Sequence, residues 1–422
     1  MEVICHPADT GLYSNISLGP NWFRTKYKTA DQLGWDEQYD SLCKTFFKRE
    51  NSPYAVFMPV GSIKYFDNPN TILDNKTRKL VEDKGLRIYL ADSLSTYHIN
   101  RPKIAMYVEY EHSDKDNIRS YELDSITTYV ERNNLSNVSV YTPNYKVEQV
   151  FAKSYPKIKL YCSPVGWVYP ATIEIDASLN TNLEKFTKHF WCGNWRYATH
   201  RHLIASFMAQ KHLDKTHLSW IYESSDELLR EKARFYNLNE LGEYTDVLKQ
   251  GANKLGTLAP LSMNISVDKK LRFEETINIH TNTNPKQFYD DAFCAIVTET
   301  RYAESTNFLT EKIMNAILNY KPFIMIGPPG NLDYMRQWGF MTYSDWFDES
   351  YDLETCHHKR MIKIFKLIDS IAEKSIDELR EMINEMDYVT NYNYIHILNL
   401  QEQLLEASIS KNKIFNRIKC AS

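Results

Sequence analysis

Three adjacent residues, Thr310, Glu311 and Lys312, have side chains well suited to bind a charged ligand. They lie in what we predict to be the first turn of a helix over 311–319. Unpaired backbone N–H groups and the positive end of the helix dipole favour phosphate at such a position. Lys312 adds a positive charge, and Glu311 adds a carboxylate that can accept hydrogen bonds from ribose hydroxyls. We therefore expect a site for a nucleoside diphosphate, although a solvated first turn would contain the same residues.

Further candidates for the same site follow a predicted strand at 189–192. Asn194 and Arg196 come directly after this strand, and Arg201 lies at the start of the next predicted helix, 200–211. An arginine guanidinium can bind two phosphate oxygens at once, so either arginine could hold a diphosphate. The alternative for Arg201 is a surface position on the helix.

Three more polar loops lie at the ends of predicted strands. Glu299 follows a strand at 295–298, and we include it among the residues that bind the donor nucleotide. The Gly-Pro-Pro-Gly segment 327–330 lacks the Lys-Ser/Thr pair of a phosphate loop, so we interpret it as a rigid turn. The acidic segment 348–352 has the composition that caps helices, and we favour capping over a metal site.

Candidates for a general base lie in the first half of the chain. Asp9 follows a predicted strand at 3–5, and Glu109 and Glu111 lie at the end of a predicted strand at 105–110. A carboxylate at the carboxyl end of a strand is well placed to take a proton from an acceptor hydroxyl. Each of the three is also a residue type common on surfaces, so the sequence leaves the base undecided.

The composition is that of a folded protein in water. The 422 residues are 43% hydrophobic and 25% charged, with a net charge of −4. The seven cysteines form no C-x-x-C pair, which favours reduced thiols in a cytoplasmic setting. No apolar run approaches the ~18 residues of a membrane-spanning helix, so we expect no membrane span. The negative net charge argues against phosphate binding across a whole face and leaves room for a local basic cleft.

Short apolar runs alternate with helical segments along both halves of the chain. This alternation predicts an α/β fold with parallel, doubly wound sheets. With the polar segment 176–182 as linker, we predict Rossmann-like domains at 1–180 and 181–385, followed by a helical tail at 386–422 that packs back on the N-terminal domain. Because ligands bind beyond the carboxyl ends of parallel strands, the two domains would face a shared cleft. The region 240–283 shows no clear periodicity, and we expect irregular structure there.

An ordered series of motifs in the second half resembles a known family. The series comprises Trp-Cys-Gly-Asn-Trp-Arg at 191–196 with His-Arg at 200–201, Ala-Ile-Val-Thr-Glu-Thr at 295–300, Phe-Leu-Thr-Glu-Lys at 308–312, the segment 322–330, Gly-Phe at 339–340 and the acidic segment 348–352. It resembles phage-encoded proteins regarded as GT-B-type glycosyltransferases, and its Thr-Glu-Lys core is similar to the donor motif of fucosyltransferases. The resemblance covers about residues 189–352.

This resemblance implies roles for individual residues. In fucosyltransferases the Glu and Lys of the motif bind the ribose and the diphosphate of the nucleotide sugar, and an upstream Arg helps to hold the phosphates. By this resemblance Glu311 would bind ribose and Lys312 phosphate. Arg196 or Arg201 would make the second phosphate contact.

The function implied is a metal-independent glycosyltransferase that takes a UDP- or GDP-sugar as co-substrate, with no bound cofactor. For a phage-encoded protein in the host cytoplasm, the acceptor we expect is a hydroxymethylated pyrimidine in duplex DNA. The segment 22–28, in which Arg24, Lys26 and Lys28 alternate with aromatic residues, could hold the DNA backbone. A glycan or protein acceptor is the alternative. A non-catalytic virion or assembly protein with the same fold also stays open, as does a nucleotide phosphorylase or sugar epimerase.

Overall fold

The computed structural model describes residues 55–58, 66, 69–70, 72–73, 75–90, 94, 96–98, 118–142, 144–162, 185–194, 197–232, 238–259, 261, 286–303 and 306–409. These residues fall into two compact units. One unit holds the described residues up to 162 together with 400–409, and the other holds those from 185 to 399. The predicted linker, and with it the predicted domain boundary at 180, lies outside the described residues.

The first unit is built on a parallel sheet with the strand order β1-β2-β5-β6. The strands are β1 (Ala55–Met58), β2 (Leu86–Leu90), β5 (Val138–Thr142) and β6 (Ile158–Cys162). Helices α4 (Asn75–Lys84), α5 (Tyr121–Arg132) and α6 (Val147–Phe151) connect them, as parallel neighbours require. Ile88 and Val140 of the sheet are fully buried together with Ile126 and Val130 of α5, which places the core between the sheet and this helix.

A short antiparallel pair precedes α5 in the chain. Strand β4 (Ile118–Ser120) pairs with β3 (Thr96–His98), so that Ile118 lies opposite His98. The spacing of Ile118, Tyr121 and Ile126 predicts a helix over about 118–133. Helix α5 begins only at Tyr121, because the three residues before it pair with β3.

The second unit contains another parallel sheet, with the order β10-β9-β7-β8. Its strands are β7 (Lys188–Cys192), β8 (Thr216–Leu218), β9 (Ala292–Thr298) and β10 (Phe323–Ile326). The chain passes from β7 to β8 on one side and then returns to place β9 on the other side of β7. This reversal creates a topological switch point between β7 and β9, beyond whose carboxyl ends ligands of open α/β sheets bind.

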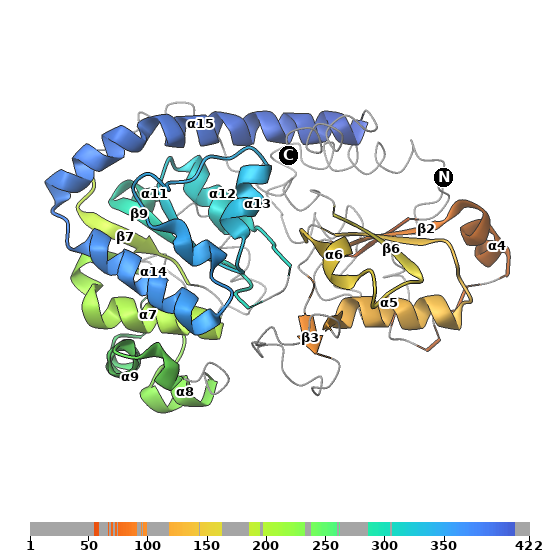
Figure 1. The fold of residues 1–422 in the computed structure, drawn as a ribbon, viewed down its shortest axis with the longest axis horizontal. Coiled ribbons are helices and arrows are strands. Elements are labelled where there is room, and N and C mark those ends of the chain that lie inside the picture. The colour runs from red at the N-terminus through yellow and green to blue at the C-terminus, as the bar shows by residue number, and fades with distance from the viewer. Residues whose placement is uncertain are drawn as a thin grey trace. The chain divides into compact units, whose positions relative to one another are not determined.

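Helices cover both faces of this second sheet (Figure 1). The described helices between residues 199 and 409 are α7 (Thr199–Lys211), α8 (Asp226–Lys232), α9 (Tyr244–Leu258), α11 (Lys286–Asp290), α12 (Glu311–Leu318), α13 (Asn331–Gln337), α14 (His357–Ala372) and α15 (Ile376–Ile409). Helices α8 and α9 pack on α7. Short 3-10 helices lie at Leu213–Lys215, Leu238–Leu241 and Glu349–Leu353. Helix α7 packs against α14, where the rings of Phe207 and Phe365 stack with centroids 4.3 Å apart. Strand β9 is buried at all seven positions and forms the centre of the unit.

The prediction of an α/β fold with parallel sheets is confirmed for the described residues. The prediction of irregular structure throughout 240–283 is wrong, because α9 occupies 244–258. Helix α15 runs without a break across position 385, where we predicted the start of a separate tail. Packing of a tail on the N-terminal domain stays a prediction.

Candidate functional site

The carboxyl ends of β7 and β9 are joined by the side chains of Asn194 and Thr298. The Thr298 hydroxyl donates to Asn194 Oδ1 at 2.9 Å, and Asn194 Nδ2 donates to Cys192 Sγ at 3.2 Å. The backbone N–H of Asn194 donates to Ser219 Oγ, just after β8, at 2.9 Å. Asn194 is fully buried, and protein atoms bind both ends of its amide. Asn194, which we predicted to bind the donor, therefore fixes the spacing of three strand ends at the switch point.

Glu299 follows β9 directly and turns its carboxylate toward the start of α12. Its Oε2 accepts a hydrogen bond of 2.6 Å from the Thr310 hydroxyl, and its Oε1 accepts one of 3.3 Å from the Thr310 backbone N–H. The backbone N–H of Thr300 lies 3.4 Å from Oε2. Glu299 is fully buried, so these donors replace its hydration. A carboxylate of the protein therefore lies at the helix start where we predicted a phosphate.

Thr310 caps α12, as its residue type predicts. Its hydroxyl oxygen accepts from the backbone N–H of Lys312 at 3.3 Å and from Lys312 Nζ at 3.1 Å. Lys312 Nζ also donates to Thr300 Oγ1 at 3.3 Å. The half-buried lysine thus folds back over the start of its own helix. Its ammonium group and the Glu299 carboxylate bind the same threonine hydroxyl.

Helix α7 begins with two buried polar residues, His200 and Arg201, each 4% exposed. Arg201 Nη2 donates to the carbonyl oxygens of Thr298 at 3.2 Å and Glu299 at 3.1 Å. His200 Nε2 donates to the same Glu299 carbonyl at 2.9 Å. Both residues therefore hold the backbone at the end of β9. The interpretation of Arg201 as a surface residue is wrong.

Positive charges gather around His200. Burial lowers the pKa of His200 to about 3, and the charges of Arg201, Arg360 and Lys312 act in the same direction. The hydrogen bond to the Glu299 carbonyl opposes them. The imidazole is therefore neutral at physiological pH.

Arg360 and Tyr302 extend this region beyond the residues that the sequence singled out. The Tyr302 ring stacks on His200 with centroids 5.4 Å apart, and the Arg360 guanidinium lies 4.0 Å from the Tyr302 centroid. Arg360 donates to the carbonyl oxygens of Tyr302 at 2.5 Å and Glu354 at 3.0 Å, and it is 1% exposed. The one sequence signal was its position on the apolar stripe of α14, one turn before Ile364.

Two asparagines meet beyond β10. Asn307 Nδ2 donates to the carbonyl oxygen of Pro329 and to Asn331 Oδ1, both at 2.9 Å. The amide nitrogen of Asn331 is buried and has no hydrogen-bond partner among the described residues. A Cβ atom on Gly327 would lie 2.3 Å from this nitrogen and 3.4 Å from Glu299 Cβ. Position 327 therefore requires glycine, and the unused donor of Asn331 lies close to Glu299.

The start of the next helix, α13, is already occupied by a carboxylate. Asp352 accepts from the backbone N–H groups of Leu332 at 3.1 Å and Asp333 at 3.2 Å. Asp348 accepts from the N–H of Ser350 at 3.0 Å. The acidic segment therefore caps helices, but these are the 3-10 helix Glu349–Leu353 and α13, whereas the long helix that follows, α14, has no side-chain cap among the described residues. With Glu299 at the start of α12, protein carboxylates lie at the starts of both α12 and α13.

Five of the predicted site residues have no described side chain. Arg196 and the three candidates for the general base, Asp9, Glu109 and Glu111, lie outside the described residues. The backbone of Glu311 begins α12, and its side chain is outside the described set. The ribose contact and the identity of the base therefore stay predictions.

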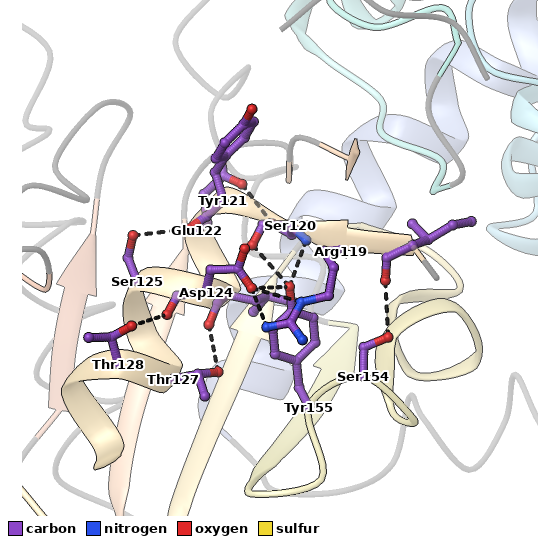
Figure 2. Close-up of polar contacts among 12 residues, drawn as sticks. Arg119, Ser120, Tyr121, Glu122, Asp124, Ser125, Thr127, Thr128, Ser154 and Tyr155 are labelled. Carbon is purple, nitrogen blue, oxygen red and sulfur yellow. Dashed lines mark hydrogen bonds and ion pairs between the residues drawn. The ribbon is translucent and has the colours of Figure 1, made fainter. Parts of the chain in front are cut away.

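A second polar cluster, which the sequence did not reveal, lies in the first unit (Figure 2). Asp124 Oδ1 accepts from Arg119 Nε at 2.9 Å, from Arg119 Nη2 at 2.5 Å and from the Tyr155 hydroxyl at 2.9 Å. The Tyr155 oxygen accepts from the backbone N–H of Ser120 at 2.7 Å. The cluster ties β4, α5 and the segment before β6 together, and we interpret it as structural.

No protein-family model, curated protein or solved structure matches this chain. Within the described residues, no group of three or more histidine, cysteine, aspartate or glutamate side chains could hold a metal ion. The described helices include none with the length and apolar character needed to cross a bilayer.

Proposed function

We propose that the protein is a metal-independent glycosyltransferase of GT-B architecture that uses a nucleotide sugar as donor. One observation carries the proposal. At the switch point of the second sheet, the Lys312 ammonium folds over the capped start of α12, next to the end of β9. The buried cations around His200 add to the positive potential of this region. A helix start with a lysine in this position suits the diphosphate of a nucleotide sugar.

In the proposed reaction the protein acts mainly by electrostatic stabilisation of the leaving diphosphate. The acceptor oxygen bonds to the anomeric carbon, and the bond between that carbon and the phosphate oxygen breaks. The nucleoside diphosphate leaves with the added negative charge, which Lys312 and the start of α12 stabilise. The proton of the acceptor hydroxyl passes to a general base, for which Asp9, Glu109 and Glu111 remain the candidates.

The first unit, with its own parallel sheet, is the proposed binding domain of the acceptor. The sequence resemblance to phage glycosyltransferases makes a hydroxymethylated pyrimidine in duplex DNA our specific proposal, with the reaction taking place in the host cytoplasm. Glycans and proteins are the alternative acceptors. Duplex DNA binding that weakens steeply with salt would support the DNA acceptor.

The test is a sugar-transfer assay with UDP- and GDP-sugars, preceded by a thermal-shift screen against UDP, GDP, ADP and CMP. We expect Lys312→Ala to lower turnover by about 10²–10³, the scale for loss of one contact to a developing anion. The matched control is Lys366→Ala, which removes an exposed lysine of α14. Near-normal transfer by Lys312→Ala would exclude Lys312 from the site.

The screen also separates the other classes of protein. Stabilisation by one nucleotide supports an enzyme, whereas indifference to all of them supports a non-catalytic virion or assembly protein. A protein that binds a nucleotide without acceptor-dependent sugar transfer would instead be a phosphorylase or an epimerase.

A further inference from the structure

The start of α12 presents a conflict between its geometry and the ligand proposed for it. The Thr310 N–H and hydroxyl, which a phosphate oxygen would use, both donate to the carboxylate of Glu299. The two anions cannot occupy the same donors, and a phosphate close to a buried carboxylate would be repelled. Either the Glu299 carboxylate prevents the ligand from binding, or it leaves the Thr310 donors when the ligand binds.

The side chain of Asn331 is oriented so that its NH2 group can serve as a second hydrogen-bond donor for the Glu299 carboxylate. The Pro329 carbonyl can only accept a hydrogen bond, so Asn307 must direct its NH2 group there. The same NH2 group donates to Asn331, which fixes Oδ1 as the atom of Asn331 that faces Asn307. The Asn331 NH2 group therefore faces Gly327. It is buried and has no acceptor among the described residues.

A buried donor without an acceptor destabilises the folded state, so its presence calls for an explanation. The ideal Cβ position of Gly327 lies 3.4 Å from Glu299 Cβ and 2.3 Å from Asn331 Nδ2, so these two atoms are separated by no more than the sum of the two distances. A glutamate side chain that pivots about its Cβ can span this separation with one hydrogen bond.

We propose that the Glu299 carboxylate is an internal anion, by which we mean a protein carboxylate that occupies the ligand's hydrogen-bond donors. It binds Thr310 at the start of α12 in the absence of ligand and is displaced from Thr310 when a phosphate binds. In the bound state its carboxylate accepts from Asn331 Nδ2, and the phosphate accepts from Thr310. The exchange gives the Asn331 donor an acceptor, and the phosphate takes the Thr310 donors that the carboxylate releases. The inference rests on the proposed function only in taking a phosphate-bearing compound as ligand.

This arrangement reverses the sign expected for a substitution of Glu299. If Glu299 were a direct contact of the donor, as its position in the sequence suggested, Glu299→Gln would weaken binding. As a competing anion, Glu299 opposes binding, so the neutral and isosteric Glu299→Gln should bind pyrophosphate about three- to tenfold more tightly. Titration calorimetry with pyrophosphate, UDP and GDP measures this change. Glu378→Gln, an exposed position at the start of α15, controls for the loss of one negative charge.

A double-mutant cycle isolates the second half of the exchange. Asn331→Asp keeps the oxygen that accepts from Asn307 and replaces the donor by a second carboxylate oxygen. We expect it to weaken pyrophosphate binding about tenfold where Glu299 is present and clearly less in the Glu299→Gln background. Equal losses in the two backgrounds would mean that Glu299 and Asn331 do not meet in the bound state.

The outcomes separate this inference from the proposed function. Tighter pyrophosphate binding by Glu299→Gln, with no nucleotide bound by either protein, would support the internal anion and remove the nucleotide-sugar donor. Nucleotide binding that Glu299→Gln weakens would overturn the internal anion and keep the donor site, and failure of both proteins to bind pyrophosphate would overturn the inference as well. A structure of the wild-type chain with pyrophosphate gives a test without substitution: a Glu299 carboxylate still bound to Thr310 would rule the exchange out.

Discussion

The hydroxyl of Thr298 and the amide oxygen of Asn194, 2.9 Å apart, connect β9 to the loop after β7. Both residues are almost completely buried, so the bond is shielded from water. We expect Thr298→Val, which preserves the shape and removes the donor, to lower the free energy of unfolding by about 1–3 kcal/mol, because Asn194 Oδ1 loses its partner. Urea unfolding measures the loss. Thr257→Val, at an exposed position of α9, is the control and should change stability much less.

Thr310 has two roles that substitutions can separate. Its hydroxyl caps α12 and donates to the buried Glu299. Thr310→Ala removes both contacts, and we expect a loss of about 1–3 kcal/mol in the free energy of unfolding. Thr310→Ser retains the hydroxyl and should lie close to the wild type in the same thermal or urea unfolding experiment. A serine variant as unstable as the alanine variant would show that the methyl group, and not the hydrogen bonds, stabilises this turn.

Acid should destabilise the second unit through His200 and His202. Burial lowers the pKa of His200 from 6.5 to about 3 and that of His202 from 6.5 to about 4. The unfolded chain therefore binds more protons between these values, and stability falls as the pH drops below 6.5. From pH 7 to pH 5 we expect each histidine to contribute a loss of about 2 kcal/mol. Comparing urea unfolding at both pH values for the wild type and His202→Gln checks this, since the variant should lose less on acidification.

Tyr155 should anchor the polar cluster of the first unit, drawn in Figure 2. Tyr155→Phe removes the acceptor of the Ser120 N–H and a donor to Asp124, and we expect it to cost about 1–3 kcal/mol. Combining it with Asp124→Asn in a double-mutant cycle measures how far the two side chains act together. Strictly additive losses would mean that the Tyr155–Asp124 bond contributes nothing of its own.

Most strands could be predicted because buried parallel strands appear as continuous apolar runs. The apolar run Leu218–Tyr222 predicts a strand, whereas β8 lies at Thr216–Leu218. The apolar Trp220, which drew the prediction toward the C-terminus, pairs with Leu261 in an isolated antiparallel bridge. The Trp220–Leu261 bridge joins segments that are far apart in the sequence, so it cannot be predicted from a local sequence pattern.

Helix α9 escaped prediction for a related reason. It contains Gly251 and Gly256, which lower helix propensity and suggest irregular structure. A Cβ atom at Gly251 would lie 1.9 Å from the carbonyl oxygen of Ser206, and one at Gly256 would lie 1.9 Å from that of Ser224. The glycines therefore allow a close approach to neighbouring segments, and packing outweighs the weak propensity.

The location of the candidate site could be predicted, whereas its internal contacts could not. Strand ends and the capped helix start were readable from residue types. The partners of Glu299 and Arg201 depend on which strand ends become neighbours, and strand order is a property of the whole sheet. The place of Arg360 in the site could not be predicted, because the position of a charged residue on an apolar stripe does not show which residues it will contact.

The complete burial of β9, flanked by β7 and β10, has a consequence for local opening of the fold. Amide protons of 292–298 should exchange with solvent only through large-scale unfolding, whereas those of exposed turns exchange through small fluctuations. The carbonyl groups of Thr298 and Glu299, to which Arg201 is bonded, adjoin this slow-exchanging segment. The end of β9 next to the start of α12 should therefore stay folded during the local fluctuations through which exposed turns exchange their amide protons.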